Sequence, residues 1–543
     1  MKLLKKILPA ILVLVLAVLL LPADVEAASS GTCGENLTWE FSSGTLTISG
    51  TGPMSTGSTP PWYSYARSIR KIVLEEGVTT IAKDAFDDCQ RVTEVHIPAS
   101  ITTIGNYAFR TDSDMEAVYI ADLAAWMQID FGGASANPLS VGQTFVKAYV
   151  DGQQLTDLVI PNGVTAVKPY VFYGYSLNSV TMPDSVITIG ENAFAKAYIG
   201  TLTVGKSVQT IGDRAFYQAG LTHVVLPDSV TQIGEEAFYL CDDAESLTIG
   251  NGGTVIGTRA FASCGFKSVT VGTGAKSFAD GAFNNTQTDS VYITDLGAWM
   301  ENDFDNSSIG GSNPLYNGAT LYLNGVAVTE LTVPAGITQI KPYTFTGCAS
   351  LTGVTVPEGV TDIGKQAFQK CVNLKTVTVS ESNIDQSAFN GCAALESVTL
   401  GDGVATIGYS AFANCDKLKT VRLGSGIQTI VTSAFEYTAP KDVYYNGTRE
   451  QWELVSVYEY GNANFLNATF HFLGEVMPGD VDGNEELTTD DAVYLLLSVM
   501  FGTEDYPVPD GTNLDFDGSG KVDTDDAVYL LLSVMFGAED YPI

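Results

Sequence analysis

The sequence predicts a repeat solenoid, a stack of parallel β-strands joined by irregular return paths, followed by a small all-α module. Two internal repeats predict this architecture. A phenylalanine, usually preceded by alanine, recurs at steps of mostly 21 to 23 residues through most of the chain. A second repeat, with a period of 35 residues, fills the C-terminal end. A single solenoid unit is too short to bury its own apolar side chains, so neighbouring units must stack on each other.

The N-terminal segment has the pattern of a secretory signal peptide. Three lysines precede an apolar run over residues 7–21, and small residues suit cleavage after Ala27. The alternative is an uncleaved anchor helix, which needs a longer apolar run than this one. We therefore expect removal of residues 1–27 and a secreted, extracellular protein.

The charge of the chain excludes some partners. The 62 acidic residues outnumber the 27 basic ones, which gives a formal net charge of -35. Nucleic-acid binding requires clustered lysine and arginine, and anionic membranes attract the same residues. We expect neither nucleic acid nor a membrane as a partner.

The solenoid unit can be read at residues 351–371. Leu351, Val354 and Val356 alternate with small polar residues, as in a half-buried strand, and Pro357 ends that strand. Phe368 then fills the interior on the return path. The recurring phenylalanines are Phe86, Phe109, Phe172, Phe194, Phe216, Phe238, Phe261, Phe283, Phe345, Phe368, Phe389, Phe412 and Phe435.

Seven of the eight cysteines occupy one phase of this repeat, three residues after the phenylalanine. A disulfide framework would not place every cysteine at the same phase, so we expect a column of buried thiols. Neighbouring coils could still bring some pairs within bonding distance. These cysteines are Cys89, Cys241, Cys264, Cys348, Cys371, Cys392 and Cys415.

Two steps of the repeat are about forty residues longer because of related insertions near 115–157 and 289–330. Both contain a Val-Tyr-Ile strand, a tryptophan (Trp126 or Trp299) and an Asn-Pro-Leu motif. A degenerate third copy carries Trp452 and Asn464-Phe465-Leu466. We expect the tryptophans to anchor these insertions by packing, rather than to form a ligand platform.

The repeats resemble the BspA-type leucine-rich repeat family, and residues 28–66 resemble the leader segment of such proteins. The resemblance covers roughly residues 31–473 and implies repeats over 67–437 and a capping segment over 438–473. It also implies a bacterial surface or secreted protein that binds host proteins or other cells. That functional implication is loose, because a fold does not fix a function.

A row of threonines precedes the last apolar residue of most strands. Such a row could bind ordered water or sugar hydroxyls, but threonine also simply suits an exposed strand position, which is the interpretation we favour. His96, Val225 and Arg422 are exceptions. The row is Thr181, Thr203, Thr248, Thr270, Thr332, Thr355, Thr378 and Thr399.

The sequence offers no catalytic motif. It has no Gly-x-Ser-x-Gly elbow, no His-Glu-x-x-His pair and no Cys-x-x-Cys pair. Its three histidines include His96 and His223, which fall on strands many coils apart. We therefore expect a non-catalytic protein.

Residues 474–543 form the second repeat, and acidic residues precede each of its two predicted helices at the spacing of a calcium loop. Calcium binds many oxygen ligands, from side chains at positions 1, 3, 5 and 12, a carbonyl at 7 and a water-mediated contact at 9. Two acidic helix caps would explain neither this spacing nor its duplication. The first loop places Asp480, Asp482, Asn484, Glu486, Thr488 and Asp491 at positions 1, 3, 5, 7, 9 and 12. The second places Asp515, Asp517, Ser519, Lys521, Asp523 and Asp526 there.

The two loops differ at position 6, where calcium loops need a sharp turn. Gly520 holds that position in the second loop, and Glu485 holds it in the first. We expect two Ca²⁺ ions, with the second loop binding more tightly.

The duplicated loop-helix pair resembles a type I dockerin over roughly residues 477–543. This resemblance implies a partner, the cohesin module of a scaffoldin in a cellulosome-like complex. The segment 492–501 is apolar nearly all round, which independently indicates a partner for a helix in so small a module. The resemblance implies partner contacts by Thr489, Asp490, Leu496, Leu497 and Met500 and by their copies Thr524, Asp525, Leu531, Leu532 and Met535.

The sequence thus favours a secreted, non-catalytic binding protein that docks onto a cohesin and presents its repeats to an unknown protein or glycan ligand. One alternative is an adhesin whose C-terminal module serves another attachment. Another is a carbohydrate-binding or hydrolytic component of a polysaccharide-degrading complex. Exposed aromatic rows would favour carbohydrate binding, and a clustered carboxylate pair in a cleft would favour a hydrolase.

Overall fold

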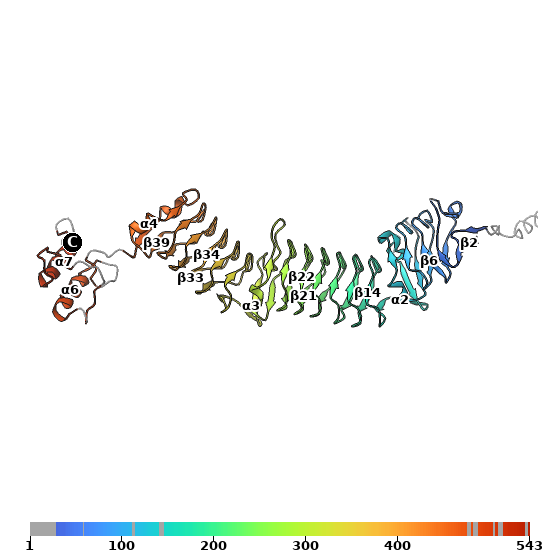
Figure 1. Ribbon diagram of the computed structural model, residues 1–543, viewed down its shortest axis with the longest axis horizontal. Coiled ribbons are helices and arrows are strands. Elements are labelled where there is room, and N and C mark those ends of the chain that lie inside the picture. Colours follow the sequence, from blue (N-terminus) through green and yellow to red (C-terminus); the bar gives the residue numbers. More distant parts are fainter. Residues whose placement is uncertain are drawn as a thin grey trace, which may run out of the picture. The chain divides into compact units, whose positions relative to one another are not determined.

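The structure is a computed structural model of the chain. It describes residues 29–57, 59–110, 114–140, 146–474, 479–481, 487–502, 505–508, 514–537 and 541–542. The chain divides into two compact units between Val326 and Ala327. Within each unit, the strands of successive coils lie side by side (Figure 1). The predicted signal peptide lies outside the described residues.

An antiparallel cap begins the first unit. Its strands are β1 (Ser29–Thr32), β2 (Leu37–Ser42) and β3 (Thr45–Gly50). β3 pairs in parallel with the first repeat strand, β5 (Lys71–Leu74), so the cap covers the edge of the repeat sheet. Trp62, beside the short helix η1 (Tyr63–Tyr65), stacks on Phe86 at 5.5 Å between ring centroids. The leader segment is therefore the N-terminal cap of the solenoid.

Each coil contributes a longer strand to one parallel sheet and, in most coils, a two-residue strand to another. The first ladder of longer strands continues with β7 (Glu94–Ile97), β9 (Ala117–Ile120), β11 (Lys147–Val150) and the antiparallel β12 (Gln153–Gln154). The short strands beside it are β4 (Gly52–Pro53), β6 (Val78–Ile81), β8 (Thr103–Ile104) and β10 (Asp130–Phe131).

New sheets begin after the first insertion. Their longer strands are β13 (Asp157–Val159), β15 (Leu177–Thr181), β17 (Ile199–Thr203), β19 (His223–Val225), β21 (Ser246–Ile249), β23 (Ser268–Val271), β25 (Ser290–Ile293) and β27 (Thr320–Leu323). Their short strands are β14 (Ala166–Val167), β16 (Thr188–Ile189), β18 (Thr210–Ile211), β20 (Gln232–Ile233), β22 (Val255–Ile256), β24 (Ser277–Phe278) and β26 (Asp303–Phe304). β28 (Val326–Ala327) spans the boundary between the units.

The second unit repeats the same arrangement. Its longer strands are β29 (Glu330–Thr332), β31 (Gly353–Val356), β33 (Thr376–Val379), β35 (Ser397–Leu400), β37 (Thr420–Leu423), β39 (Asp442–Tyr445) and β41 (Thr469–Phe472). Its short strands are β30 (Gln339–Ile340), β32 (Asp362–Ile363), β34 (Asn383–Ile384), β36 (Thr406–Ile407), β38 (Thr429–Ile430) and β40 (Ser456–Val457). The parallel solenoid predicted from the repeat is confirmed.

The recurring phenylalanines form the spine of the core. From Phe172 to Phe283 the rings of successive coils stack with centroids 5.0 to 5.5 Å apart. In the second unit Phe465 extends the stack beyond Phe435 at 4.3 Å, so the third insertion copy caps the solenoid. Stacking requires the backbones to lie close together. At Gly212 a Cβ atom would lie 2.8 Å from the amide nitrogen of Glu191 on the preceding coil, which explains the recurring Ile-Gly.

The cysteine column is buried, as predicted, and all eight cysteines are free thiols. Several sulfhydryls donate to the carbonyl oxygen of the phenylalanine on the preceding coil. Cys264 contacts Phe238 O at 2.9 Å, for example. Thr286 occupies the same phase and donates its hydroxyl to Phe261 O at 2.8 Å. In most coils the position thus takes a small side chain that can donate to a buried carbonyl, and in two coils it takes the small apolar Ala197 or Ala219.

The first two insertions are anchored by packing, as predicted. Trp126, in α2 (Leu123–Trp126), and Trp299, in α3 (Leu296–Met300), are buried. The 3₁₀ turns η2 (Ala134–Ala136) and η3 (Pro138–Ser140) flank a buried Asn137. Its amide donates to the carbonyl oxygens of Tyr170 and Val171 at 2.8 and 2.9 Å. This side chain therefore links the insertion to the next coil, where the strand ladder is interrupted.

The third insertion copy differs in detail from the sequence prediction. It forms α4 (Arg449–Trp452) and α5 (Ala463–Leu466), and Trp452 is only partly buried. The buried asparagine is Asn462 rather than Asn464, which is exposed. Asn462 accepts from the backbone N–H of Phe435 at 2.9 Å and thus holds the cap on the last coil.

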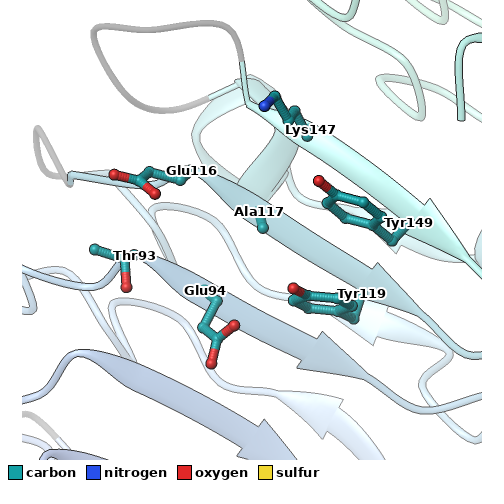
Figure 2. Close-up of a pocket in the computed structure, with 7 residues that line it drawn as sticks. All are labelled: Thr93, Glu94, Glu116, Ala117, Tyr119, Lys147 and Tyr149. Carbon is teal, nitrogen blue, oxygen red and sulfur yellow. The ribbon is translucent and has the colours of Figure 1, made fainter. Parts of the chain in front are cut away.

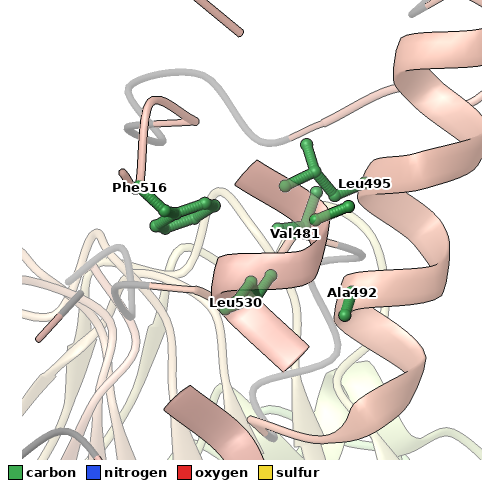
Figure 3. Packing of buried hydrophobic residues seen from close by; sticks show 6 residues of the cluster. Val481, Ala492, Leu495, Phe516 and Leu530 are labelled. Carbon is green, nitrogen blue, oxygen red and sulfur yellow. The ribbon is translucent and has the colours of Figure 1, made fainter. Parts of the chain in front are cut away.

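The C-terminal module consists of two identical helices, α6 (Thr489–Phe501) and α7 (Thr524–Phe536). A small core joins them, with equivalent residues contributed by each half (Figure 3). Ala492 and Leu495 match Ala527 and Leu530, and two loop residues complete the core. These loop residues are Val481 and Phe516.

Candidate functional site

The second acidic loop gathers three of its predicted calcium ligands. Carboxylate oxygens of Asp515, Asp517 and Asp526 all lie within 4.8 Å of one another. Oxygens that share one calcium ion lie about 2.3–2.6 Å from it, so no two are more than about 5 Å apart. The three carboxylates repel each other without a cation. Their geometry and chemistry therefore fit a hard divalent cation such as Ca²⁺.

Other residues of this loop hold the carboxylates in place through backbone hydrogen bonds. Gly520 has φ +85°, which favours glycine, and its N–H donates to Asp515 at 2.8 Å. The N–H of Ser519 donates to Asp517 at 2.9 Å, and this bond is the largest cause that lowers the pKa of Asp517. The hydroxyl of Ser519 faces the carbonyl oxygen of Lys521 at 3.3 Å. Asp517 thus stays ionised, as a cation ligand must.

The aspartate at position 12 closes each loop in the same way. Asp526 accepts from the N–H of Phe516 and of Asp523, both at 2.8 Å. Asp491 accepts from Val481 at 2.9 Å and from Thr488 at 2.7 Å. Thr488 and Asp523, at position 9, are also the N-caps of α6 and α7. The first loop therefore repeats the closure of the second.

The described part of the first loop contains three of its six predicted ligands, Asp480, Thr488 and Asp491. Asp480, at position 1, is buried, whereas Asp482, Asn484 and Glu486 lie outside the described residues, as does Glu485. Two calcium ions, and the expected difference between the loops, remain predictions.

The predicted partner residues divide into two groups. Met500 and Met535 are each 60% exposed, and the predicted contact residues in the first turn of each helix are exposed as well. Leu496 and Leu531 instead pack against the small core, so they also stabilise the module. The exposed first-turn residues are Thr489 and Asp490 in α6 and Thr524 and Asp525 in α7.

Sequence reasoning missed part of the exposed apolar surface of the module. Val493 lies four residues before the half-buried Leu497 and seven before Met500, so the three share one face of α6. Val493 and Phe501 are 53% and 59% exposed. The copies Val528 and Phe536 are exposed to the same extent, at 54% and 60%. Helical spacing applied to the duplicated segment could have found them.

The threonine row lies on the outer face of the sheets, as expected, but aromatic pairs replace it at the insertions. Tyr119 and Tyr149 stack at 5.1 Å, and Tyr292 and Tyr322 stack at 4.9 Å. At the C-terminal cap the ring pair is Tyr444 and His471, at 4.5 Å. These pairs were not predicted, although the shared Val-Tyr dipeptide falls at the threonine position of the strand.

Tyr119 and Tyr149 border a groove of about 420 Å³ (Figure 2). The groove is also lined by Thr93, Ala117 and three charged residues. Lys71, outside this lining, pairs with the lining residue Glu94 at 2.8 Å between Nζ and Oε1. The other charged lining residues are Glu116 and Lys147.

This groove contains two carboxylates, the feature that would favour a hydrolase. Glu116 is exposed and Glu94 is half-exposed and ion-paired. A carboxyl group that acts as a general acid is usually desolvated to raise its pKa. The two groups therefore resemble hydrogen-bonding ligands more than an acid–base pair.

The parallel strand ladders, the stacked phenylalanine spine and the capped ends define a leucine-rich-repeat solenoid. Six copies of the BspA type leucine rich repeat region match the chain, over residues 61–125, 146–220, 209–311 and 318–440. These matches cover more than half of the chain, which therefore belongs to the BspA-type leucine-rich repeat family.

Several solved structures are also similar to the chain. A leucine-rich repeat protein from Bacteroides ovatus is 19% identical, over 81% of this chain and 98% of that one, with a TM-score of 0.39. A leucine rich cell surface protein from Faecalibacterium prausnitzii is 22% identical, over 79% and 97%, with a TM-score of 0.31. The pneumococcal vaccine antigen PcpA is 15% identical, over 79% and 98%, with a TM-score of 0.32.

No curated protein matches the chain. Among the helices of the described residues, none is both long and apolar enough to span a bilayer.

Proposed function

We propose that this protein is a secreted, non-catalytic binding protein that attaches through its C-terminal module to a cohesin and presents its repeat surface to a ligand. The observation that carries the proposal is the carboxylate cluster of Asp515, Asp517 and Asp526 at the start of a duplicated helix. Calcium supplies the positive charge that this cluster lacks and orders the loop in front of the helix.

The exposed apolar residues of both helices support a protein partner. Met500, Phe501 and their copies lie in water in a module with a small core. Large exposed apolar side chains grouped on one helix are typical of an interaction surface. The partner that we propose, from the dockerin resemblance, is the cohesin module of a scaffoldin.

The repeat domain supports the non-catalytic part of the proposal. Its strands present short polar side chains on a regular outer face, and the family match indicates a binding scaffold rather than a catalytic one. Export through the signal peptide would place this face outside the cell.

The test is calorimetric titration of the full chain with a panel of type I cohesin modules, in calcium and in EGTA. We expect one cohesin per chain in calcium and none in EGTA. If the folded chain binds no cohesin in calcium, the module serves another attachment, as in the adhesin alternative.

A further inference from the structure

We propose that the groove over Ala117 binds a neutral saccharide. This inference deepens the proposed function, because it names a ligand class for the repeat domain. It rests on that domain being a binding surface and not on the C-terminal module. The groove lies at the first insertion, where Tyr119 and Tyr149 replace the threonine row.

The shape of the groove comes from one short side chain. The strand pairing places Lys71, Glu94, Ala117 and Lys147 in a row across four neighbouring strands. Three of these side chains are long, and the methyl group of Ala117 leaves a gap between Glu94 and Lys147. The resulting volume of about 420 Å³ is in the range of pockets that hold small ligands.

The charges around the gap indicate a neutral, polar ligand. Glu94 is neutralised by Lys71, and Glu116 is balanced by Lys147, so the four charges sum to zero. Glu116 and Lys147 form no ion pair with any described residue. A carboxylate accepts hydrogen bonds from hydroxyl groups and an ammonium group donates to them. A polyhydroxyl ligand uses both, whereas a charged ligand meets a like charge on one side.

Tyr119 and Tyr149 add aromatic rings and phenolic hydroxyl groups to the charged residues of the groove. The rings are nearly parallel, at 17°, and their phenolic oxygens lie on the side that faces Ala117 (Figure 2). Neither phenol has a hydrogen-bond partner among the described residues. A saccharide has hydroxyl edges and C–H faces, and tyrosine offers a hydroxyl tip on an apolar ring. His96 stacks on the other face of Tyr119 at 4.3 Å between ring centroids, so Tyr119 presents its hydroxyl tip and ring edge to the groove. These groups and the charged hydrogen-bonding side chains suit one sugar unit.

The second insertion provides a matched control. Tyr292 and Tyr322 repeat the ring pair, but Ser268, Ser290 and Thr320 occupy the positions of Glu94, Ala117 and Lys147. A Tyr292→Thr variant thus loses the same ring at the same phase, without touching the groove.

The experiment is calorimetry of the full chain with cellohexaose, maltohexaose, mannohexaose and xylohexaose, each in calcium and in EGTA. We expect at least one of them to bind at one site, equally in both buffers. Ala117→Leu fills the gap on the solvent side of the sheet and should weaken binding at least about tenfold. Tyr119→Thr restores the residue of the threonine row and should cost about two- to tenfold, as expected for one lost hydrogen bond.

Three results would overturn the proposal. They are no binding of any of the four hexasaccharides, an equal loss in Tyr292→Thr, and tighter binding of polygalacturonate or hexalysine than of a neutral sugar. Because saccharide binding is measured without a cohesin and in EGTA, its failure is distinct from failure of the calcium-dependent attachment.

Discussion

The sulfhydryl of Cys392 donates a hydrogen bond to the carbonyl oxygen of Phe368 on the preceding coil, at 3.3 Å between sulfur and oxygen. Both residues are fully buried. The contact explains why the column prefers cysteine or threonine to a purely apolar residue, because a buried carbonyl without enough donors is destabilising.

We expect Cys392→Ala to lower the free energy of unfolding by about 1 kcal/mol, since it removes this donor and leaves a small cavity. Cys392→Thr places the residue of Thr286 and Thr438 at the same phase and should be less destabilising. Urea denaturation followed by tryptophan fluorescence measures both. A more stable Cys392→Ala variant would contradict the role of the hydrogen bond.

The solenoid thiols should be unreactive in the native protein and reactive after unfolding. Burial raises the pKa of Cys89 and of Cys415 to about 12, so both thiols stay protonated near pH 8, where the reactive thiolate is absent. Titration with a disulfide reagent, without prior reduction, should find at least five thiols in unfolded protein. One or none would show that the column forms disulfides.

The two acidic loops should bind two calcium ions, with the second loop the tighter. Asp526→Asn removes one charge from the cluster and should eliminate one ion in calorimetric titration of the full chain. Asp525→Asn changes the neighbouring exposed carboxylate and should keep both ions. Equal loss of calcium in both variants would indicate unspecific attraction to an acidic surface.

The two equivalent helices should give one-to-one cohesin binding in two orientations. Leu497→Asp with Met500→Asp disables one exposed face and spares Leu496, which packs in the core. If both modes are equally strong, affinity falls about twofold, or roughly 0.4 kcal/mol. Leu532→Asp with Met535→Asp should behave alike.

Combining both pairs of substitutions should abolish cohesin binding, because no intact apolar face remains. Calorimetry of the wild type and the three variants against one cohesin distinguishes the possibilities. Complete loss from only one single-half variant would show a single fixed orientation.

The coil periodicity was predictable from the sequence because each coil repeats the same local pattern. Alternation at Leu351, Val354 and Val356, the stop at Pro357 and the recurring Phe368 determine strand, turn and core without knowledge of the neighbours. The packing of Trp126 and Trp299 was also predicted, and the spacing of the acidic residues predicted that Asp515, Asp517 and Asp526 belong to one loop. Because consecutive units have similar local sequences, stacking them in the same register buries the apolar side chains of every unit.

The details that depend on register were decided by the tertiary structure. Tyr119 and Tyr149 are 30 positions apart in the chain, and they stack only because the insertion returns to pair β11 with β9. In the cap, Asn462 rather than the predicted Asn464 is buried. The pairing between coils also decides this, because a buried amide must lie where backbone groups can hydrogen-bond to it. The groove over Ala117 is likewise formed by side chains of strands that the sequence separates. The repeat period in the sequence therefore determined the coils of this protein. The strand pairing between coils decided which side chains meet on its surface.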